Sequence, residues 1–363
     1  MRITLVHDDF CQIGGAERLF AEIAKIYPNA PIYTSLVNWS KIPRSISPNR
    51  IHTSFIQKIP YAAKLYKILL PLYPLAFESF DFSGFDLVIS STTRFAKSIV
   101  TKPSTIHISY VNSAPRFLYN QDQANEYLPQ SLRFILKPYF NWLKRWDKTA
   151  SSRADFYVAN SQNIAAQIKN VYGREAGIVH PAVDTDFFQN SRKSQKSGYY
   201  LVVSRLVKWK KIDIAIEACQ QLGVNLKIVG KGPDTNRLKK LSGNSIEFID
   251  NATREELRGL YQNAKALIVT QEEDFGMAMV EAQACGTSII AYGFGGSKEI
   301  VVDGKTGLFF NKQTPQSAKD AINRHSKLKW GSTACRKSAL RFSRATFRNN
   351  LTSAVSKYAI PNH

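Results

Sequence analysis

Two carboxylates, Glu273 and Glu281, stand eight residues apart in the segment EEDFGMAMVEAQACG, which is the most informative part of the chain. Gly276 lies between them and predicts the start of a helix that should end at Gly286. A helix that begins at a glycine presents backbone N–H groups and a positive dipole end to an anion. The pattern therefore fits a phosphorylated sugar, with phosphate at the helix end and sugar hydroxyls on the carboxylates. An ordinary pair of surface carboxylates is the alternative, which the later Gly295-Gly296 turn disfavours.

The same segment closely resembles the Glu-x7-Glu signature of family 4 retaining glycosyltransferases, which have the GT-B fold. The match continues from EEDFGM through VEAQACGTSIIAYGFGG to a later glutamate. The resemblance implies that Glu281 binds the ribose hydroxyls of a nucleotide-sugar donor and that Glu273 binds hydroxyls of its sugar. It also implies donor contacts from the intervening residues and their backbone N–H groups: Asp274, Phe275, Gly276 and Met277.

A basic pair, Arg205 and Lys210, follows a predicted strand at 199–203 in the segment SRLVKWKKID. At the carboxyl end of a strand, an arginine and a lysine can converge on a diphosphate. On composition alone, a basic loop in a basic protein is a serious competing interpretation. The resemblance favours the first interpretation, because the family carries this pair as SRLxxxKxxD and Asp213 is also present. It implies that the pair binds the donor pyrophosphate and stabilises the leaving phosphate.

The N-terminal half carries weaker motifs of the same resemblance. Gly14 and Gly15 resemble the family's phosphate-approaching glycine loop, although a plain tight turn would also explain them. Asn112, in YVNSAPRFLY, stands where many members have a catalytic-site histidine beside the transferred sugar. Because asparagine does not titrate near neutral pH, this departure points to a different sugar, a different acceptor or reduced activity. By the same resemblance, His7 and Arg116 are expected with Asn112 on the acceptor side.

Strand-like and helix-like runs alternate along the chain, which predicts parallel α/β sheets covered on both faces. A polar stretch at 190–196 interrupts the alternation, which restarts with a strand at 199. We therefore expect two Rossmann-like, doubly wound domains, and the resemblance implies that they face a central cleft as in GT-B proteins. The expected domains are an acceptor-side domain at 1–192 and a nucleotide-sugar domain at 193–344. A final helix within 345–363 is expected to cross back to the first domain.

The formal net charge of +21 requires a partner of opposite sign, either nucleic acid or an anionic membrane face. Basic and aromatic residues alternate in two segments, 55–77 and 132–148, as is typical of docking at a membrane interface. Buried helix faces with solvated lysines are the ordinary alternative. We expect an anionic membrane surface and no nucleic acid, because the donor motif is intact.

The four cysteines are scattered without a CxxC pair, which suggests a reducing compartment and no structural zinc. No apolar run reaches the roughly 18–20 residues that span a bilayer, and the chain enters a strand at once without a signal peptide. We expect a cytoplasmic protein at the inner face of the plasma membrane. The Asp184-x-Asp186 pattern could suggest a metal, but it resembles a structural PxVDxxxF stretch of the family. We therefore predict no catalytic metal and no cofactor other than the donor substrate.

The forms EEDFGM, SRLVKWKKID and VNSAPRFLY are most similar to the mannosyltransferases of bacterial O-antigen and exopolysaccharide assembly. That similarity implies GDP-mannose as donor and a polyprenyl-linked glycan as acceptor. Two alternatives stay open. One is an enzyme of the same fold with a UDP- or ADP-sugar, such as a sucrose-type synthase, or a phosphorylase. The other is a catalytically weak scaffold subunit of a glycan assembly complex, which the departure at Asn112 motivates.

Overall fold

The computed structural model describes residues 1–66, 68–119, 136–190 and 198–359. The chain divides into two compact units, Met1–His180 with Phe347–His363, and Pro181–Thr346. We call them unit 1 and unit 2. The expected boundary at 192/193, with most of the polar stretch around it, lies outside the described residues.

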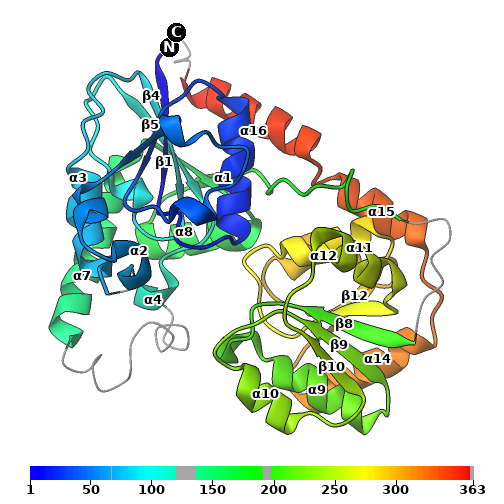
Figure 1. Ribbon diagram of the computed structural model, residues 1–363. Coiled ribbons are helices and arrows are strands. Elements are labelled where there is room, and N and C mark those ends of the chain that lie inside the picture. Colours follow the sequence, from blue (N-terminus) through cyan, green and yellow to red (C-terminus); the bar gives the residue numbers. More distant parts are fainter. Residues whose placement is uncertain (67, 120–135, 191–197, 360–363) are drawn as a thin grey trace. The chain divides into compact units, whose positions relative to one another are not determined.

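Unit 1 contains a seven-stranded parallel sheet in the order β3-β2-β1-β4-β5-β6-β7 (Figure 1). The strands are β1 (Ile3–His7), β2 (Ile32–Thr34), β3 (Ile51–Thr53), β4 (Leu87–Thr92), β5 (Ile106–Val111), β6 (Phe156–Ala159) and β7 (Ala176–Ile178). The helices are α1 (Gly15–Ile26), α2 (Ala62–Leu65), α3 (Tyr73–Glu78), α4 (Arg116–Tyr119), α7 (Lys137–Ala150), α8 (Gln162–Tyr172) and α16 (Arg344–Ala359). Every residue of β4 is buried, as expected for a central parallel strand covered on both faces. The strand order reverses between β1 and β4.

Unit 2 contains a six-stranded parallel sheet in the order β10-β9-β8-β11-β12-β13. The strands are β8 (Tyr199–Val203), β9 (Asn225–Val229), β10 (Ile246–Ile249), β11 (Ala266–Val269), β12 (Ser288–Tyr292) and β13 (Gly307–Phe310). The helices are α9 (Ile212–Gln221), α10 (Thr235–Leu241), α11 (Arg254–Asn263), α12 (Met277–Ala284), α13 (Ser297–Ile300), α14 (Pro315–Ser326) and α15 (Ser332–Leu340). Here the order reverses between β8 and β11. The prediction of two doubly wound parallel domains is confirmed.

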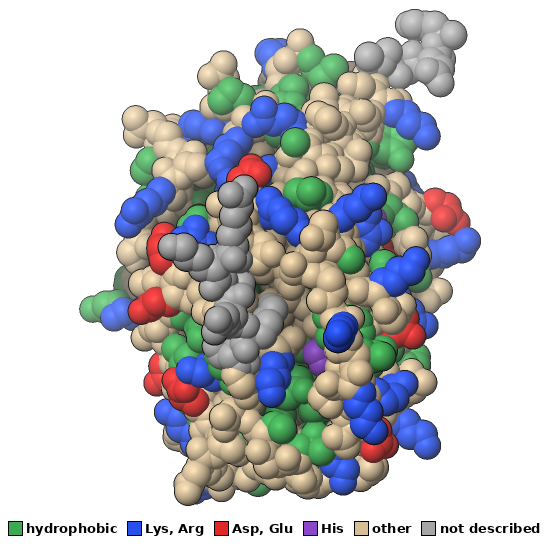
Figure 2. All heavy atoms as spheres, turned by 90° about the vertical axis from the view of Figure 1, so that its right-hand side faces the viewer, with side chains coloured by type: hydrophobic (Ala, Val, Ile, Leu, Met, Phe, Trp, Pro, Cys, Tyr) green, Lys and Arg blue, Asp and Glu red, His purple; other side chains and the backbone are tan. Residues whose placement is uncertain are grey.

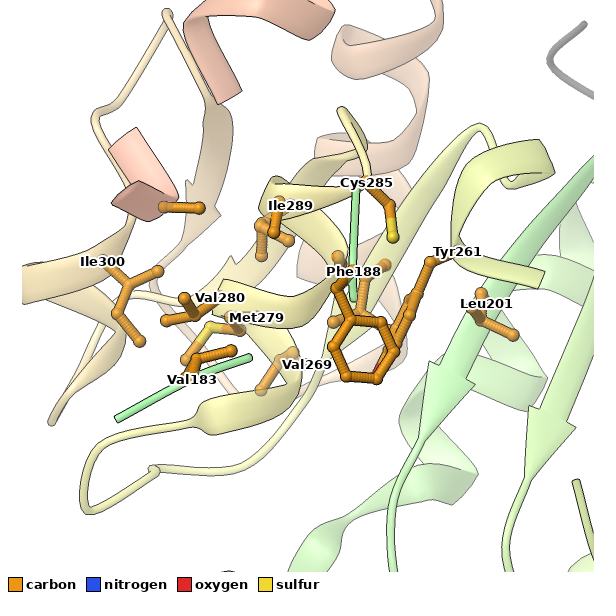
Figure 3. Close-up of a cluster of buried hydrophobic side chains, with 14 of the residues drawn as sticks. Val183, Phe188, Leu201, Tyr261, Val269, Met279, Val280, Cys285, Ile289 and Ile300 are labelled. Carbon is orange, nitrogen blue, oxygen red and sulfur yellow. The ribbon is translucent and has the colours of Figure 1, made fainter. Parts of the chain in front are cut away.

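The hydrophobic core of unit 2 continues directly under the helix that follows β11. Met279 and Val280 of α12 pack with Phe188, Tyr261 and Ile289 in one buried cluster (Figure 3). Almost the whole of α12 is buried, because its apolar positions occur on all sides rather than on one stripe. This packing fixes the helix on which the Glu-x7-Glu segment depends.

The last helix, α16, packs on unit 1 through aromatic side chains. The Phe347 ring lies 6.2 Å from that of Tyr110, and the Tyr358 ring stacks on Phe156 at 4.4 Å. Gly177 on β7 leaves room for the Tyr358 hydroxyl, which would lie 2.9 Å from a Cβ at that position. These contacts explain why the chain from Phe347 onward belongs to unit 1.

Candidate functional site

The carboxyl ends of β8 and β11 lie side by side where the strand order of unit 2 reverses. Parallel α/β sheets bind ligands at such points. Lys210 follows β8 in a short helical turn (Lys208–Lys210), and Glu273 follows β11. The Nζ atom of Lys210 lies 2.6 Å from Oε1 of Glu273, with the side chains only 12% and 19% exposed. The structure thus brings together two predicted site residues that are 63 positions apart.

A glycine turn after β12 holds the main chain of Glu273. The N–H of Gly296 donates to the carbonyl oxygen of Glu273 at 2.7 Å, and Glu273 forms a parallel bridge with Gly295. A Cβ on Gly296 would lie 2.5 Å from backbone atoms of Phe275, so a larger residue would push the two loops apart. The Gly295-Gly296 turn noted in the sequence therefore positions the first carboxylate.

Gly276 starts α12 with φ of +106°, a left-handed conformation that favours glycine. Glycine has no side chain with which to cap the helix, so the N–H groups of the first turn can meet an anion. Asp274 and Met277 on either side are half-buried, whereas Phe275 is buried and packs its ring 5.2 Å from Phe342. The predicted phosphate-binding helix end is therefore built on a firmly packed loop.

Glu281 is buried within α12 and only 5% exposed. Its Oε2 atom accepts a hydrogen bond of 3.0 Å from the hydroxyl of Tyr261 on α11 (Figure 3 labels Tyr261). This hydroxyl fixes the carboxylate in one orientation. Nothing in the sequence pointed to Tyr261, because a contact 20 positions apart leaves no local pattern.

Arg205 is exposed in the loop after β8. The backbone of this loop packs closely on the turn after β9, where a Cβ on Gly230 would lie 2.0 Å from the carbonyl oxygen of Ser204. Asp213, the last residue of the basic motif, forms an ion pair of 3.0 Å with Arg237. Asp213 thus ties α9 to α10, while Arg205 extends toward solvent from the same edge of the sheet as Lys210.

In unit 1, the corresponding reversal of strand order has His7 as the last residue of β1 and Asp8 immediately after it. His7 is buried, donates from Nδ1 to the carbonyl oxygen of Ser91 at 3.1 Å, and stacks on Phe20. The Asp8 carboxylate accepts hydrogen bonds from four consecutive backbone N–H groups of the loop after β4: those of Thr93, Arg94, Phe95 and Ala96. Burial would raise the pKa of Asp8, but the charges of Arg94 and His7 and these N–H groups hold it below its ordinary value.

Asn112 follows β5 and is 8% exposed. Its amide nitrogen donates to Oγ of Ser91 at 3.0 Å and to the carbonyl oxygen of Thr92 at 3.4 Å. Because that carbonyl can only accept, the nitrogen must face it, and Oδ1 points the other way. Oδ1 makes no hydrogen bond within the described part of the chain, so it can accept one from a hydroxyl. Arg116, at the start of α4, is half-buried.

The Gly14-Gly15 loop is partly occupied by the chain itself. The N–H of Gly14 donates to Oε2 of Glu17 at 2.7 Å, and Glu17 is only 3% exposed. Burial raises the pKa of this carboxyl. In this arrangement Glu17 binds one backbone N–H of the glycine loop that was predicted to approach a donor phosphate, whereas Gly15 is exposed. The G-x-x-E spacing is that of a capping box and could have indicated this contact.

Within the described ranges, no three His, Cys, Asp or Glu side chains are grouped to hold a metal ion. Asp184 of the Asp-x-Asp pattern instead forms ion pairs with Arg254 at 2.6 Å and Arg344 at 3.0 Å. The predicted absence of a catalytic metal stays a prediction. None of the helices the structure describes is long and apolar enough to cross a membrane.

The two basic-aromatic segments place large apolar side chains on the surface of unit 1: Tyr61 (75% exposed), Ile68 (69%), Leu75 (58%) and Trp142 (50%). Residues 132–135 of the second segment lie outside the described residues. Its helix, α7, is anchored by a buried ion pair of 2.5 Å between Asp147 and Lys97. Lysine and arginine side chains are also spread widely over the face shown in Figure 2, in keeping with the charge of +21.

Solved glycosyltransferase structures share this architecture. The Anabaena HepE protein, solved in complex with UDP and glucose, matches with a TM-score of 0.70 and 19% identity over 98% of this chain and 99% of that one. Sucrose-phosphate synthase from Thermosynechococcus elongatus matches with a TM-score of 0.74 and 16% identity over 98% and 99%. At these low sequence identities, the structural similarity shows the fold alone, and that fold is GT-B.

The family model "Glycosyl transferases group 1" matches residues 183–345, which is nearly all of unit 2. This part of the chain is therefore similar to group 1 glycosyltransferases. An uncharacterized glycosyltransferase of Methanocaldococcus jannaschii is 28% identical over 48% of this chain and 50% of its own. The D-inositol 3-phosphate glycosyltransferase of Mycobacteroides abscessus is 29% identical over 47% and 44%. These matches span about half the length of each relative. Neither relative is named as a mannosyltransferase, so the similarity to mannosyltransferases stays a hypothesis.

Proposed function

We propose that the protein transfers a sugar from a nucleotide-diphosphate sugar to a glycan acceptor with retention at the anomeric carbon. One observation carries the proposal: the ammonium of Lys210 and the carboxylate of Glu273 meet at 2.6 Å where the strand order reverses in a domain similar to group 1 glycosyltransferases. A site for a sugar phosphate needs a cation that binds the phosphate and an anion that accepts hydrogen bonds from the sugar hydroxyls.

The side chains divide the donor between them. Arg205 and Lys210 bind the pyrophosphate, Glu273 accepts hydrogen bonds from sugar hydroxyls, and Glu281, held by Tyr261, binds the ribose. Backbone N–H groups of the segment 274–277 assist at the helix end. The bond from the anomeric carbon to the phosphate oxygen breaks, and the cations stabilise the charge that develops on the leaving phosphate. The acceptor hydroxyl attacks from the same face and gives its proton to a phosphate oxygen, so no protein nucleophile is required.

GDP-mannose is the first donor to test, on the similarity of EEDFGM and SRLVKWKKID to mannosyltransferases. UDP-glucose is the second, because the Anabaena HepE protein of the same fold was also solved in complex with UDP-glucose. The rest of the mechanism is the same for both donors, since the diphosphate and the sugar hydroxyls are common to them.

The proposed acceptor is a polyprenyl-linked glycan at the inner face of the plasma membrane. Exposed Tyr61, Ile68 and Trp142 stand among lysines of α2 and α7, which suits anionic headgroups. Vesicle flotation tests this part: the protein should bind vesicles containing about one third anionic lipid, with binding weakened by salt. Replacing Ile68 and Trp142 with serine should release it, whereas Trp39→Ser, at an exposed tryptophan elsewhere in unit 1, should not.

Calorimetric titration tests the donor. GDP, UDP, ADP and their mannose and glucose conjugates are added without metal to the wild-type protein and to Glu281→Ala. Selective GDP binding that Glu281→Ala weakens supports the mannosyltransferase proposal. Selective binding of UDP or ADP would change the proposed donor and leave the proposed mechanism as it is. Absence of nucleotide binding removes the enzyme proposal in favour of a scaffold subunit, which the departure at Asn112 would then explain.

A further inference from the structure

Gln271 lies between the end of β11 and Glu273, and its side chain is turned inward. It is 5% exposed, and its amide nitrogen donates to Oε1 of Glu273 in a close contact. The same oxygen receives the ammonium of Lys210 at 2.6 Å. Two donors of different kinds, one charged and one neutral, therefore converge on a single carboxylate oxygen.

The two donors respond differently to a bound diphosphate. A ligand that carries two or more negative charges competes with Glu273 for the ammonium of Lys210, because both attract the same point charge. The amide of Gln271 has no net charge and is buried, so the phosphate does not draw it away. When Lys210 turns to the phosphate, the hydrogen bond from Gln271 to Glu273 remains.

The main chains on both sides are already fixed. The N–H of Gly296 holds the carbonyl oxygen of Glu273, and Oγ1 of Thr270 donates to the carbonyl oxygen of Lys210 at 2.9 Å. The amide of Gln313 in turn donates to the carbonyl oxygen of Thr270, also at 2.9 Å. Because these backbone groups are held, a bound nucleotide sugar would act mainly on side-chain torsions. The hydrogen bond from Gln271 restrains the torsions of the Glu273 side chain.

We propose that Gln271 is a positioning residue that orients the Glu273 carboxylate and favours its ionised form while Lys210 moves to the donor phosphate. A hydrogen bond to the charged form of an acid stabilises that form, so removing the amide raises the pKa of Glu273. The contact is a property of the protein alone, whereas its use in donor recognition rests on the function proposed above.

Carbon-13 NMR of the glutamate side-chain carboxyls tests the contact without any substrate. The Glu273 signal is assigned as the one missing from Glu273→Gln, and its pKa is then measured in wild type, Gln271→Met and Gln271→Glu. Methionine keeps the length of the side chain and lacks the N–H, so the pKa should rise by about 0.5–1 unit. Glutamate places a like charge on the same oxygen and should raise it further. Gln313→Met, which removes a neighbouring amide that bonds Thr270 instead, should leave it unchanged.

Inorganic diphosphate then serves as the probe for Lys210. Adding it should raise the pKa of Glu273 more in Gln271→Met than in wild type, because the variant then lacks the amide as well as the ammonium of Lys210. Equal pKa values in wild type and a folded Gln271→Met would overturn the proposal, and so would an equal rise in Gln313→Met. If the protein binds no nucleotide, the pKa of Glu273 measured without ligand still shows whether Gln271 donates a hydrogen bond to Glu273. If it transfers sugar, the acidic limb of the pH–rate profile should move with the pKa, whereas general damage would lower the rate equally at every pH.

Discussion

The ion pair between Lys210 and Glu273 makes a prediction that can be worked from the structure. Lys210→Ala removes the ammonium that lies 2.6 Å from Oε1 of Glu273. A hydrogen bond from a charged donor to phosphate contributes about 1.5–3 kcal/mol, which corresponds to roughly a 10- to 150-fold loss of affinity. Calorimetric titration with the nucleoside diphosphate that the wild-type protein binds measures this loss. Lys208→Ala is the matched control, since it removes one exposed lysine from the same turn and the same net charge.

The partner substitution gives the opposite pattern. Glu273→Gln releases Lys210 from its carboxylate, so affinity for the nucleoside diphosphate should stay the same or increase. Transfer from the nucleotide sugar should nevertheless fall, because the sugar hydroxyls lose an ionised acceptor. The reasoning is refuted if Lys208→Ala weakens binding as much as Lys210→Ala does, or if Glu273→Gln loses nucleoside diphosphate affinity in the same proportion as Lys210→Ala.

Three further predictions concern other parts of the fold. Gly296→Ala should destabilise the protein by about 1–3 kcal/mol in urea, because its Cβ would meet the Phe275 backbone at 2.5 Å, whereas Gly259→Ala, with nothing within 4 Å, should not. Asn112→Leu removes an acceptor, Oδ1, and should lower the transfer rate roughly tenfold while leaving nucleotide affinity unchanged. Steady-state rates and calorimetry would measure the two effects, and an unchanged transfer rate would exclude the assigned role. Burial lowers the pKa of His107 to about 4, whereas the pKa in the unfolded chain is near 6.5. The neutral buried ring therefore contributes its full stability above about pH 6.5. As the pH falls toward 4, the free energy of unfolding decreases by up to about 3 kcal/mol. Urea titrations at pH 7 and 5 should show a smaller loss in His107→Gln than in wild type, and no change from wild type in His52→Gln, an exposed histidine.

Much of the fold could be predicted because the relevant signals are local. β11 is a short run of apolar residues and β4 begins with one, and helices such as α1 carry their apolar residues at 3.6-residue spacing. The same local signals placed Lys210 and Glu273 after strands, and therefore at the carboxyl edge of one sheet. Their pairing depends on β8 and β11 being neighbours, which follows from the order of the strands and not from either motif.

The parts that sequence analysis missed are side-chain contacts over long separations or against local expectation. Tyr261 reaches Glu281 from the helix before β11, and Gln271 turns its amide inward although glutamine is usually exposed. Glu17 is different, since its spacing from Gly14 is a local signal. The glycine loop was interpreted through the ligand that it could bind, and its own capping carboxylate was overlooked.

The two acidic residues at the reversals of strand order show why position alone does not assign a function. Asp8 in unit 1 and Glu273 in unit 2 both follow a central strand, and each lies near a cation: the charge of Arg94 acts on Asp8, and Lys210 forms an ion pair with Glu273. Each oxygen of Asp8 accepts two backbone N–H bonds and a further bond from a threonine hydroxyl, so its capacity is filled by the loop that it braces. An arriving hydroxyl would have to displace backbone groups that cannot move without unfolding the loop. At Glu273, one donor is a lysine side chain that a phosphate can draw away, so this carboxylate can exchange that partner for a ligand at small cost. The kind of partner, more than the burial or the place in the fold, therefore distinguishes a structural carboxylate from one suited to binding a substrate.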